Sequence, residues 1–245
     1  MINQTFGIHS YCFRKFTNQE FALAARELGV DNVSVSGVHG RFAEPQGFDE
    51  ILAIYREAGL QISNIGVVQL TGDETVDRHP FEFARRAGAK IMAVNFKPET
   101  FDKAGPLAQK LAEEYDVWCG IHNHGGYHWL GNSEILGHIF KNSGPRLGLF
   151  LDTAWALAAL QNPVEMVKKF GDRLYGIHLK DFIFDRQGKP EDVIVGEGGL
   201  DLPAFVRAVE DTGFKGSCTL EYEAEPENPL PALQKCAAAI RGIQV

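Results

Sequence analysis

The sequence predicts a single (β/α)8 barrel, in which eight parallel strands form a closed ring inside eight helices. Three observations support this fold class. Short β-rich runs alternate with amphipathic stretches along the whole chain. Several helical stretches end on a glycine, and the next strand begins two or three residues later. One barrel would use nearly all of the 245 residues, and no linker divides them, so we expect one domain over 1–245.

Eight runs rich in β-branched, aromatic and other apolar residues are expected to form the strands. In chain order, they are 6–13, 32–37, 61–70, 90–96, 117–124, 146–153, 174–182 and 216–223.

Amphipathic stretches between these runs are expected to form the helices. They are 18–28, 48–58, 80–87, 106–115, 132–144, 164–170, 202–212 and 232–243, of which 132–144 is weakened by Gly137. Gly29, Gly59, Gly88 and Gly213 stand where a helix would end in a left-handed residue.

Composition and charge argue against several classes of partner. The net charge is −8, from 32 acidic and 24 basic residues, and no Lys/Arg run provides the positive surface that nucleic acids require. No apolar stretch approaches the roughly 20 residues of a membrane helix, and no signal peptide is apparent. Four scattered cysteines without a C-x-x-C pair indicate buried thiols, so we expect a cytoplasmic protein.

Polar residues gather at the predicted carboxyl ends of the strands, where barrels of this class carry their active sites. They are His9 and Tyr11; Asn95 and Lys97; His122 and His124; Asp152; His178 and Lys180; and Glu221 and Glu223. A single histidine there is commonly structural, Asp152 could cap a turn, and the glutamates could be solvated. However, imidazoles and carboxylates from four neighbouring strands are costly to collect unless something neutralises them.

A divalent cation would neutralise and orient such a set. Mixed imidazole and carboxylate ligands suit Mn²⁺, Zn²⁺, Co²⁺ or Fe²⁺ better than Mg²⁺ or Ca²⁺, which prefer oxygen ligands. The pattern therefore predicts one divalent metal at the barrel mouth.

Four segments resemble the xylose isomerase-like barrels of the sugar phosphate isomerase/epimerase superfamily, and the resemblance covers essentially the whole chain. They are "LDT" at 151–153, "GIHLKD" at 176–181, "VGEGGLDL" at 195–202 and "GSCTLEYE" at 216–223. The resemblance implies one metal held by His122, Asp152, His178 and Glu221, one from each of four successive strands. It also implies a small carbohydrate substrate and is compatible with a homo-oligomer.

Two positions depart from the family pattern. Relatives usually have glutamate where this chain has His122, so a proton shuttle between two glutamates loses one partner. Trp155 replaces a histidine that usually binds substrate, which suggests a more apolar pocket wall.

The chemistry implied is removal of a proton next to a carbonyl, through a metal-stabilised enediolate. We expect His124, Glu221 and Lys180 to be catalytic. The expected substrate-binding residues are His9, Lys97, Trp129, Trp155 and Glu223, and Gly125 and Gly126 would turn the chain so that Tyr127 also lines the pocket.

An isomerase or epimerase acting on a sugar, a sugar phosphate or a keto-sugar is the main expectation. A metal-dependent dehydratase or lyase acting on a keto-sugar or keto-inositol is the alternative, because the strand-5 glutamate is absent. A non-catalytic carbohydrate-binding barrel and an endonuclease IV-like enzyme are remote alternatives. The latter would need more metal ligands and a basic surface than this chain offers.

Overall fold

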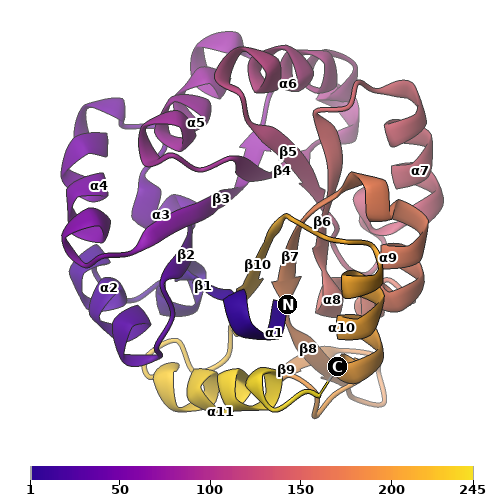
Figure 1. Ribbon diagram of the computed structural model, residues 1–245. Coiled ribbons are helices and arrows are strands. Elements are labelled where there is room, and N and C mark those ends of the chain that lie inside the picture. Colours follow the sequence, from indigo (N-terminus) through magenta and orange to yellow (C-terminus); the bar gives the residue numbers. More distant parts are fainter. Residues whose placement is uncertain (1, 245) are drawn as a thin grey trace.

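The computed structural model describes residues 2–244 and has the predicted architecture. Eight parallel strands close into a barrel in the order β1-β10-β7-β6-β5-β4-β3-β2, and the helices surround them (Figure 1). The barrel strands are β1 Gly7–His9, β2 Asn32–Val35, β3 Gln61–Leu70, β4 Ile91–Phe96, β5 Trp118–His122, β6 Leu147–Asp152, β7 Leu174–Leu179 and β10 Ser217–Leu220.

Eight helices, one after each barrel strand, form the outer ring within the described chain. They are α2 Asn18–Glu27, α4 Phe48–Glu57, α5 Glu74–Ala87, α6 Phe101–Tyr115, α7 Ser133–Asn142, α9 Pro163–Phe170, α10 Leu202–Asp211 and α11 Leu230–Arg241. Shorter helices are α1 Ile2–Thr5, α3 Gly37–Gly40 and α8 Thr153–Ala158. Helices α5 and α6 begin several residues before their predicted starts, and the expected helix over 132–144 is present as α7.

The predicted glycine terminators adopt the backbone conformation for which they were singled out. Gly29, Gly59, Gly88 and Gly213 have φ values of 71°, 69°, 74° and 67°, in the left-handed region that side chains with a Cβ disfavour. Each therefore ends its helix and redirects the chain toward the next strand.

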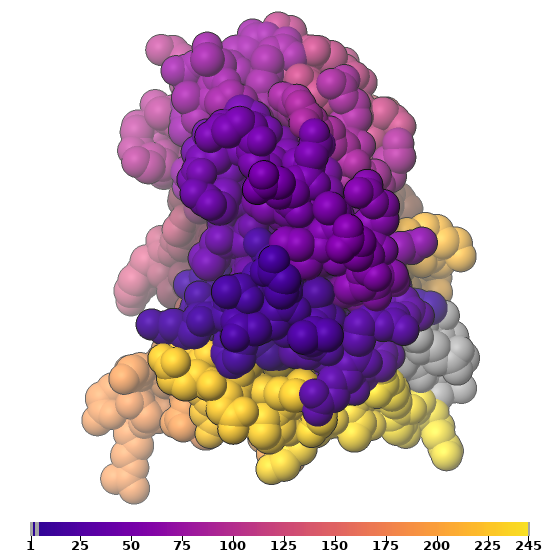
Figure 2. Space-filling view, turned by 90° about the vertical axis from the view of Figure 1, so that its left-hand side faces the viewer, coloured from indigo at the N-terminus to yellow at the C-terminus, as the bar shows by residue number. Residues whose placement is uncertain are grey.

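Six of the eight barrel strands end earlier than the apolar runs predict, whereas β3 and β4 end where expected. The 174–182 run divides, because β7 ends at Leu179 and an antiparallel hairpin follows, formed by β8 Asp181–Phe184 and β9 Pro190–Val193. In Figure 2 this hairpin, in orange, projects beyond the body of the barrel. Glu221 and Glu223 likewise follow β10 rather than lying within it.

One aromatic side chain fills the barrel interior between β5 and β7. Phe150 of β6 is fully buried, and a Cβ on Gly176 would lie 2.2 Å from its ring. A Cβ on Gly120 would lie 2.7 Å from Phe150 Cβ. The two glycines thus make room for the ring, which packs 4.6 Å from His178, centroid to centroid.

All four cysteines are buried free thiols, as their scattered positions indicate. Among the described residues, none of the helices combines the length and apolar character needed to cross a bilayer.

Candidate metal centre and active site

Four of the predicted site residues converge at the carboxyl end of the barrel. His122, Asp152, His178 and Glu221 are buried, and one potential ligand atom from each lies within 4.8 Å of all the others. His122 Nε2 is 3.1 Å from His178 Nδ1 and 3.6 Å from Asp152 Oδ2. His178 Nδ1 is 3.2 Å from Glu221 Oε2. Ligands that surround one cation at about 2.0–2.2 Å have mutual distances of this order.

Asp152 both caps a helix and contributes to the cluster. Its Oδ1 accepts a hydrogen bond from Trp155 N at 2.8 Å, at the start of α8, so the turn-capping interpretation of this residue also holds. Its Oδ2 is buried and has no hydrogen-bond partner among the described residues. Asn123 fixes the Asp152 backbone, because its side chain bonds both Asp152 N and Asp152 O.

The electrostatics of the cluster call for a cation. Burial raises the pKa of Asp152 well above its ordinary value. Burial would also raise the pKa of Glu221, but the nearby His178 and Lys180 outweigh it and lower that pKa. Burial, followed by the neighbouring His178, lowers the pKa of His122. Its imidazole is therefore neutral and has a lone pair available for a metal ion. Two imidazoles and two carboxyl groups, one of them with an unpaired buried oxygen, fit a divalent metal.

His124 lies beside the cluster without joining it. Its ring centroid is 4.8 Å from that of His122 and 4.6 Å from that of His128. The His124 Nε2 atom is buried without a hydrogen-bond partner among the described residues. Burial, with a smaller contribution from His128, lowers the pKa of His124 to about 4. At neutral pH this imidazole is therefore an unoccupied proton acceptor next to the cluster.

Lys180 is a buried cation held by carboxylates. Its Nζ pairs with Glu223 Oε1 and lies 3.7 Å from Asp192 Oδ1 and 4.0 Å from Glu221 Oε2. Burial would lower the pKa of Lys180, but these carboxylates outweigh it and raise the pKa, so the ammonium stays charged. Glu223, expected to bind substrate, is occupied as a partner of Lys180.

Asp192 of β9 is a site residue that the sequence did not reveal. It accepts a hydrogen bond from Glu223 N at 3.3 Å in addition to its contact with Lys180. Nothing in the polar segment "PEDV" indicates this role, because the hairpin that carries it back to the mouth was not expected.

His9 reaches the cluster from β1, the strand next to β10 in the barrel. Its Nε2 is 3.6 Å from Glu221 Oε1, and its ring is 4.5 Å from that of His178. Burial, then the neighbouring His178, lowers the pKa of His9 to about 3. The position at the cluster agrees with the one expected from the end of β1.

The two tryptophans predicted to bind substrate have different surroundings. Trp155 packs against Phe182, with ring centroids 5.0 Å apart, and Lys180 Nζ is 5.4 Å from the Trp155 ring centroid, so this tryptophan borders the site. Trp129 donates its indole N–H to Phe96 O at 3.0 Å and packs on a phenylalanine of α6.

Two further rim residues are exposed to solvent. Lys97 is exposed after β4, and its ammonium makes no ion pair within the described chain. The expectation for Tyr127 is wrong: its side chain is fully exposed, because the loop directs it into solvent.

The "HLKD" and "GEGG" segments are joined by one carboxylate. Asp181 accepts hydrogen bonds from Gly196 N, Gly198 N and Leu200 N, at 2.9, 2.9 and 3.0 Å. A Cβ on Gly198 would lie 2.5 Å from Asp181 Oδ1, so the close approach requires glycine. This contact explains why the two motifs occur together, and it fixes the loop that follows the hairpin.

Comparison with known proteins agrees with this architecture. The family model for the xylose isomerase-like TIM barrel matches residues 22–242. The solved structure of 3-keto-D-glucoside 4-epimerase from E. coli superposes with a TM-score of 0.75 at 16% identity, covering 97% of this chain and 98% of that one.

Curated relatives match shorter segments. The rhizopine catabolism protein MocC of Rhizobium meliloti is 25% identical over 143 residues, which are 53% of this chain and 43% of that protein. An inosose dehydratase of Clostridium botulinum is 23% identical over 137 residues, 49% of this chain and 46% of that enzyme. The matches thus span somewhat less than half the length of these relatives. On the strength of the family match and the closed barrel, the chain belongs to the xylose isomerase-like TIM barrel family.

Proposed function

We propose that the protein is a divalent-metal-dependent enzyme that isomerises or epimerises a small sugar or keto-sugar by removing the proton next to its carbonyl. The observation that carries this proposal is the buried convergence of His122, Asp152, His178 and Glu221, with the free Nε2 of His124 beside it. A structural polar cluster would satisfy its own buried atoms, whereas this one leaves acceptors without partners.

The four convergent residues would hold the cation. Two imidazoles among the ligands favour Mn²⁺, Zn²⁺, Co²⁺ or Fe²⁺ over Mg²⁺. When bound, such an ion supplies Lewis-acid stabilisation of the negative charge that develops on the carbonyl oxygen.

His124 is the proposed base. Its neutral imidazole has an unpaired, buried Nε2 next to the ligand cluster, where a carbon adjacent to a bound carbonyl would lie. Glu221 has a second oxygen that faces His9 rather than the other ligands, so it can assist in holding a proton on the substrate.

Lys180 is proposed to act as a fixed positive charge and not as a proton donor. The carboxylates around it keep the ammonium charged, and its position over Trp155 and Phe182 directs it to the site wall. There it would stabilise an oxyanion or bind a substrate hydroxyl. Trp155, beside Lys180, and His9, beside Glu221, would contact the substrate.

The substrate class is supported by the relatives and by the pocket chemistry. The epimerase and the dehydratase described above are both named for substrates that are ketones of polyols. A site with one aromatic wall and several fixed polar groups suits a small polyhydroxylated ligand.

The test is a panel of keto-sugars, sugar phosphates and keto-inositols incubated with the enzyme and Mn²⁺ in D₂O. NMR would follow both deuterium exchange next to the carbonyl and loss of water. We expect metal-dependent exchange with at least one keto-sugar. A metal-loaded protein that exchanges no proton on any member of the panel would contradict the proposal.

One observation favours a dehydratase as the second candidate. Epimerisation at a carbon needs acid/base groups on both of its faces, and the glutamate that relatives carry on strand 5 is His122 here. The site then offers one free base, His124, which would take the proton and return it to the departing hydroxyl as water leaves, while Lys180 stays a fixed cation. In the same assay, exchange accompanied by an unsaturated product would select this candidate.

A further inference from the structure

A chain of buried polar side chains crosses the barrel interior beneath His9. His9 Nδ1 is 2.8 Å from Ser34 Oγ, and Ser34 Oγ donates to Asn64 Oδ1 at 2.5 Å. Asn64 Nδ2 in turn donates to Ser217 Oγ at 2.8 Å. Ser34 and Asn64 are fully buried, so each group depends on its neighbour in the chain for its hydrogen bond.

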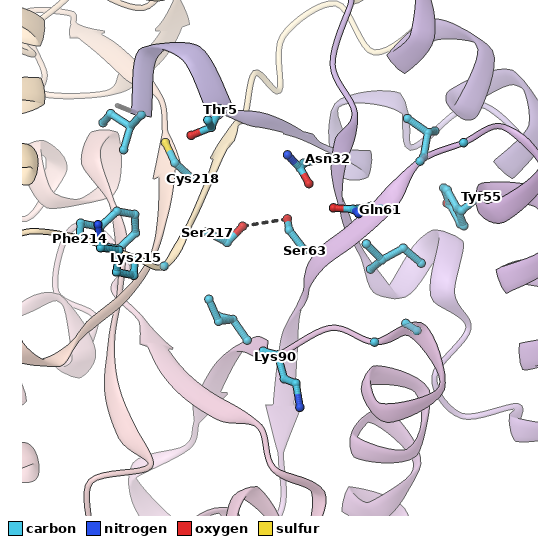
Figure 3. Close-up of a pocket in the computed structure, with 18 of the residues that line it drawn as sticks. Thr5, Asn32, Tyr55, Gln61, Ser63, Lys90, Phe214, Lys215, Ser217 and Cys218 are labelled. Atoms are coloured by element: carbon cyan, nitrogen blue, oxygen red, sulfur yellow. Dashed lines mark hydrogen bonds between the residues drawn. The ribbon is translucent and has the colours of Figure 1, made fainter.

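The far end of the chain lies at the opposite end of the barrel. Ser217 Oγ is 2.8 Å from Ser63 Oγ, and both hydroxyls line a cavity of about 1170 Å³ at the amino ends of the strands (Figure 3). The two serine oxygens lie 2.8 and 3.4 Å from Asn64 Nδ2, so both are within reach of the amide N–H groups. Ser63 Oγ donates its hydrogen to Val33 O at 3.3 Å, so the hydroxyl of Ser217 donates to Ser63 Oγ. Ser217 Oγ is then left to accept from the amide, which places Asn64 Nδ2 toward Ser217 and Oδ1 toward Ser34.

The amide orientation determines where the protons lie along the chain. Asn64 Oδ1 can only accept, so the single hydroxyl hydrogen of Ser34 is committed to it. Ser34 Oγ can then only accept from His9, which requires the hydrogen of the imidazole to be on Nδ1. His9 Nε2 is left as an acceptor facing Glu221 Oε1, and their separation of 3.6 Å is too long for a hydrogen bond.

We propose that Ser34 and Asn64 are positioning residues that hold His9 in its Nδ1–H tautomer, so that Nε2 accepts a hydrogen bond from a substrate hydroxyl. His9 Nε2 and Glu221 Oε1 are adjacent acceptors at the edge of the ligand cluster. A ligand that donates hydroxyl hydrogens to this pair is preferred over one that lacks them. The assignment of the tautomer is independent of any activity, whereas its consequence for substrates rests on the proposed function.

The first experiment measures the tautomer in metal-free protein labelled with ¹⁵N-histidine. Long-range ¹⁵N–¹H spectra distinguish Nδ1–H from Nε2–H, and the His9→Gln variant identifies the His9 signals. We expect Nδ1–H in the wild-type protein and a mixture of tautomers in Ser34→Ala. Ser34→Thr keeps the hydroxyl and should restore Nδ1–H.

A second variant and a control separate this effect from general disruption. Asn64→Leu removes the acceptor of the Ser34 hydroxyl and should also give a mixture of His9 tautomers. Asn142→Leu on α7, which is not part of the hydrogen-bond chain, should leave the His9 tautomer unchanged. Ser34→Ala is nearly isosteric, so the test does not depend on whether Asn64→Leu folds. An Nε2–H tautomer in the wild type, or a tautomer that Ser34→Ala does not alter, would overturn the proposal.

The kinetic consequence is tested with a substrate identified in the exchange panel. Ser34→Ala should lower kcat/KM about 10-fold, the effect of one hydrogen bond, for a substrate with a hydroxyl next to the carbonyl. For the matching deoxy compound it should change little. Equal losses for both compounds would overturn the hydroxyl contact. Absence of any turnover would contradict the proposed function, whereas the tautomer assignment from the NMR experiment would still hold.

Discussion

The two sides of the barrel interior support the site in different ways. Beneath His122 and His178, Phe150 fills the space that Gly120 and Gly176 leave open, and the support is apolar packing. Beneath His9, the support is a chain of hydrogen bonds through Ser34 and Asn64. Packing fixes where a ring lies, whereas hydrogen bonds also fix which atom carries the proton. The His122 and His178 rings therefore need a fixed position, whereas the His9 ring needs a fixed tautomer as well.

The cluster that joins the two sides should give the largest effect when it is broken. His178→Ala removes one ligand and should abolish both metal retention and activity, because three remaining groups cannot hold the ion as tightly. Elemental analysis of protein purified without chelator should find about one Mn, Zn, Co or Fe per wild-type chain.

The exposed His138 on α7 provides the matched control, since His138→Ala should retain the metal. Full metal content in His178→Ala would remove this residue from the ligand set.

The packed side should respond to a change of volume. Phe150→Ala leaves a cavity under the ligands and should reduce the free energy of unfolding by about 3–5 kcal/mol, measured by urea denaturation. Phe184→Ala, at a side chain that is 41% exposed on the β8–β9 hairpin, should cost less than about 1 kcal/mol. Similar losses for the two variants would mean that Phe150 is not the support described here.

The stability of the protein should depend on pH through two buried histidines, His9 on the hydrogen-bonded side and His124 beside His122. Burial lowers the pKa of His9 to about 3 and of His124 to about 4 in the folded protein. The unfolded chain, with ordinary histidine pKa values near 6.5, binds more protons below that pH. The metal-free protein should therefore have its full stability above pH 6.5 and lose up to about 1.4 kcal/mol per pH unit for each of these histidines below it.

Urea unfolding at pH 7, 6 and 5 measures this slope. His9→Gln should make it shallower, and His138→Gln should not. A free energy of unfolding that is constant over this range would contradict burial of neutral imidazoles.

Sequence reasoning identified what periodicity encodes. The alternation of strands and helices, the glycine terminators and the positions of four polar residues at the strand ends follow from spacing, and the structure places them as expected. Their role as metal ligands stays a prediction. Contacts between segments distant in the sequence could not be predicted from local patterns. Asp192 reaches Lys180 only because a hairpin folds back, and Ser34 and Asn64 meet His9 only inside the closed barrel. Tyr127 was misplaced because loop direction depends on packing that no local pattern records.

The most direct test of the central claim concerns His124 as the base beside the metal. The measurement is deuterium exchange next to the carbonyl of an accepted substrate, by NMR, for wild type and His124→Ala, each with its metal content determined. We predict that His124→Ala keeps its metal and loses exchange by about 10²–10⁴-fold. Exchange at the wild-type rate in a metal-loaded His124→Ala protein would contradict the account and place the base elsewhere, on Glu221.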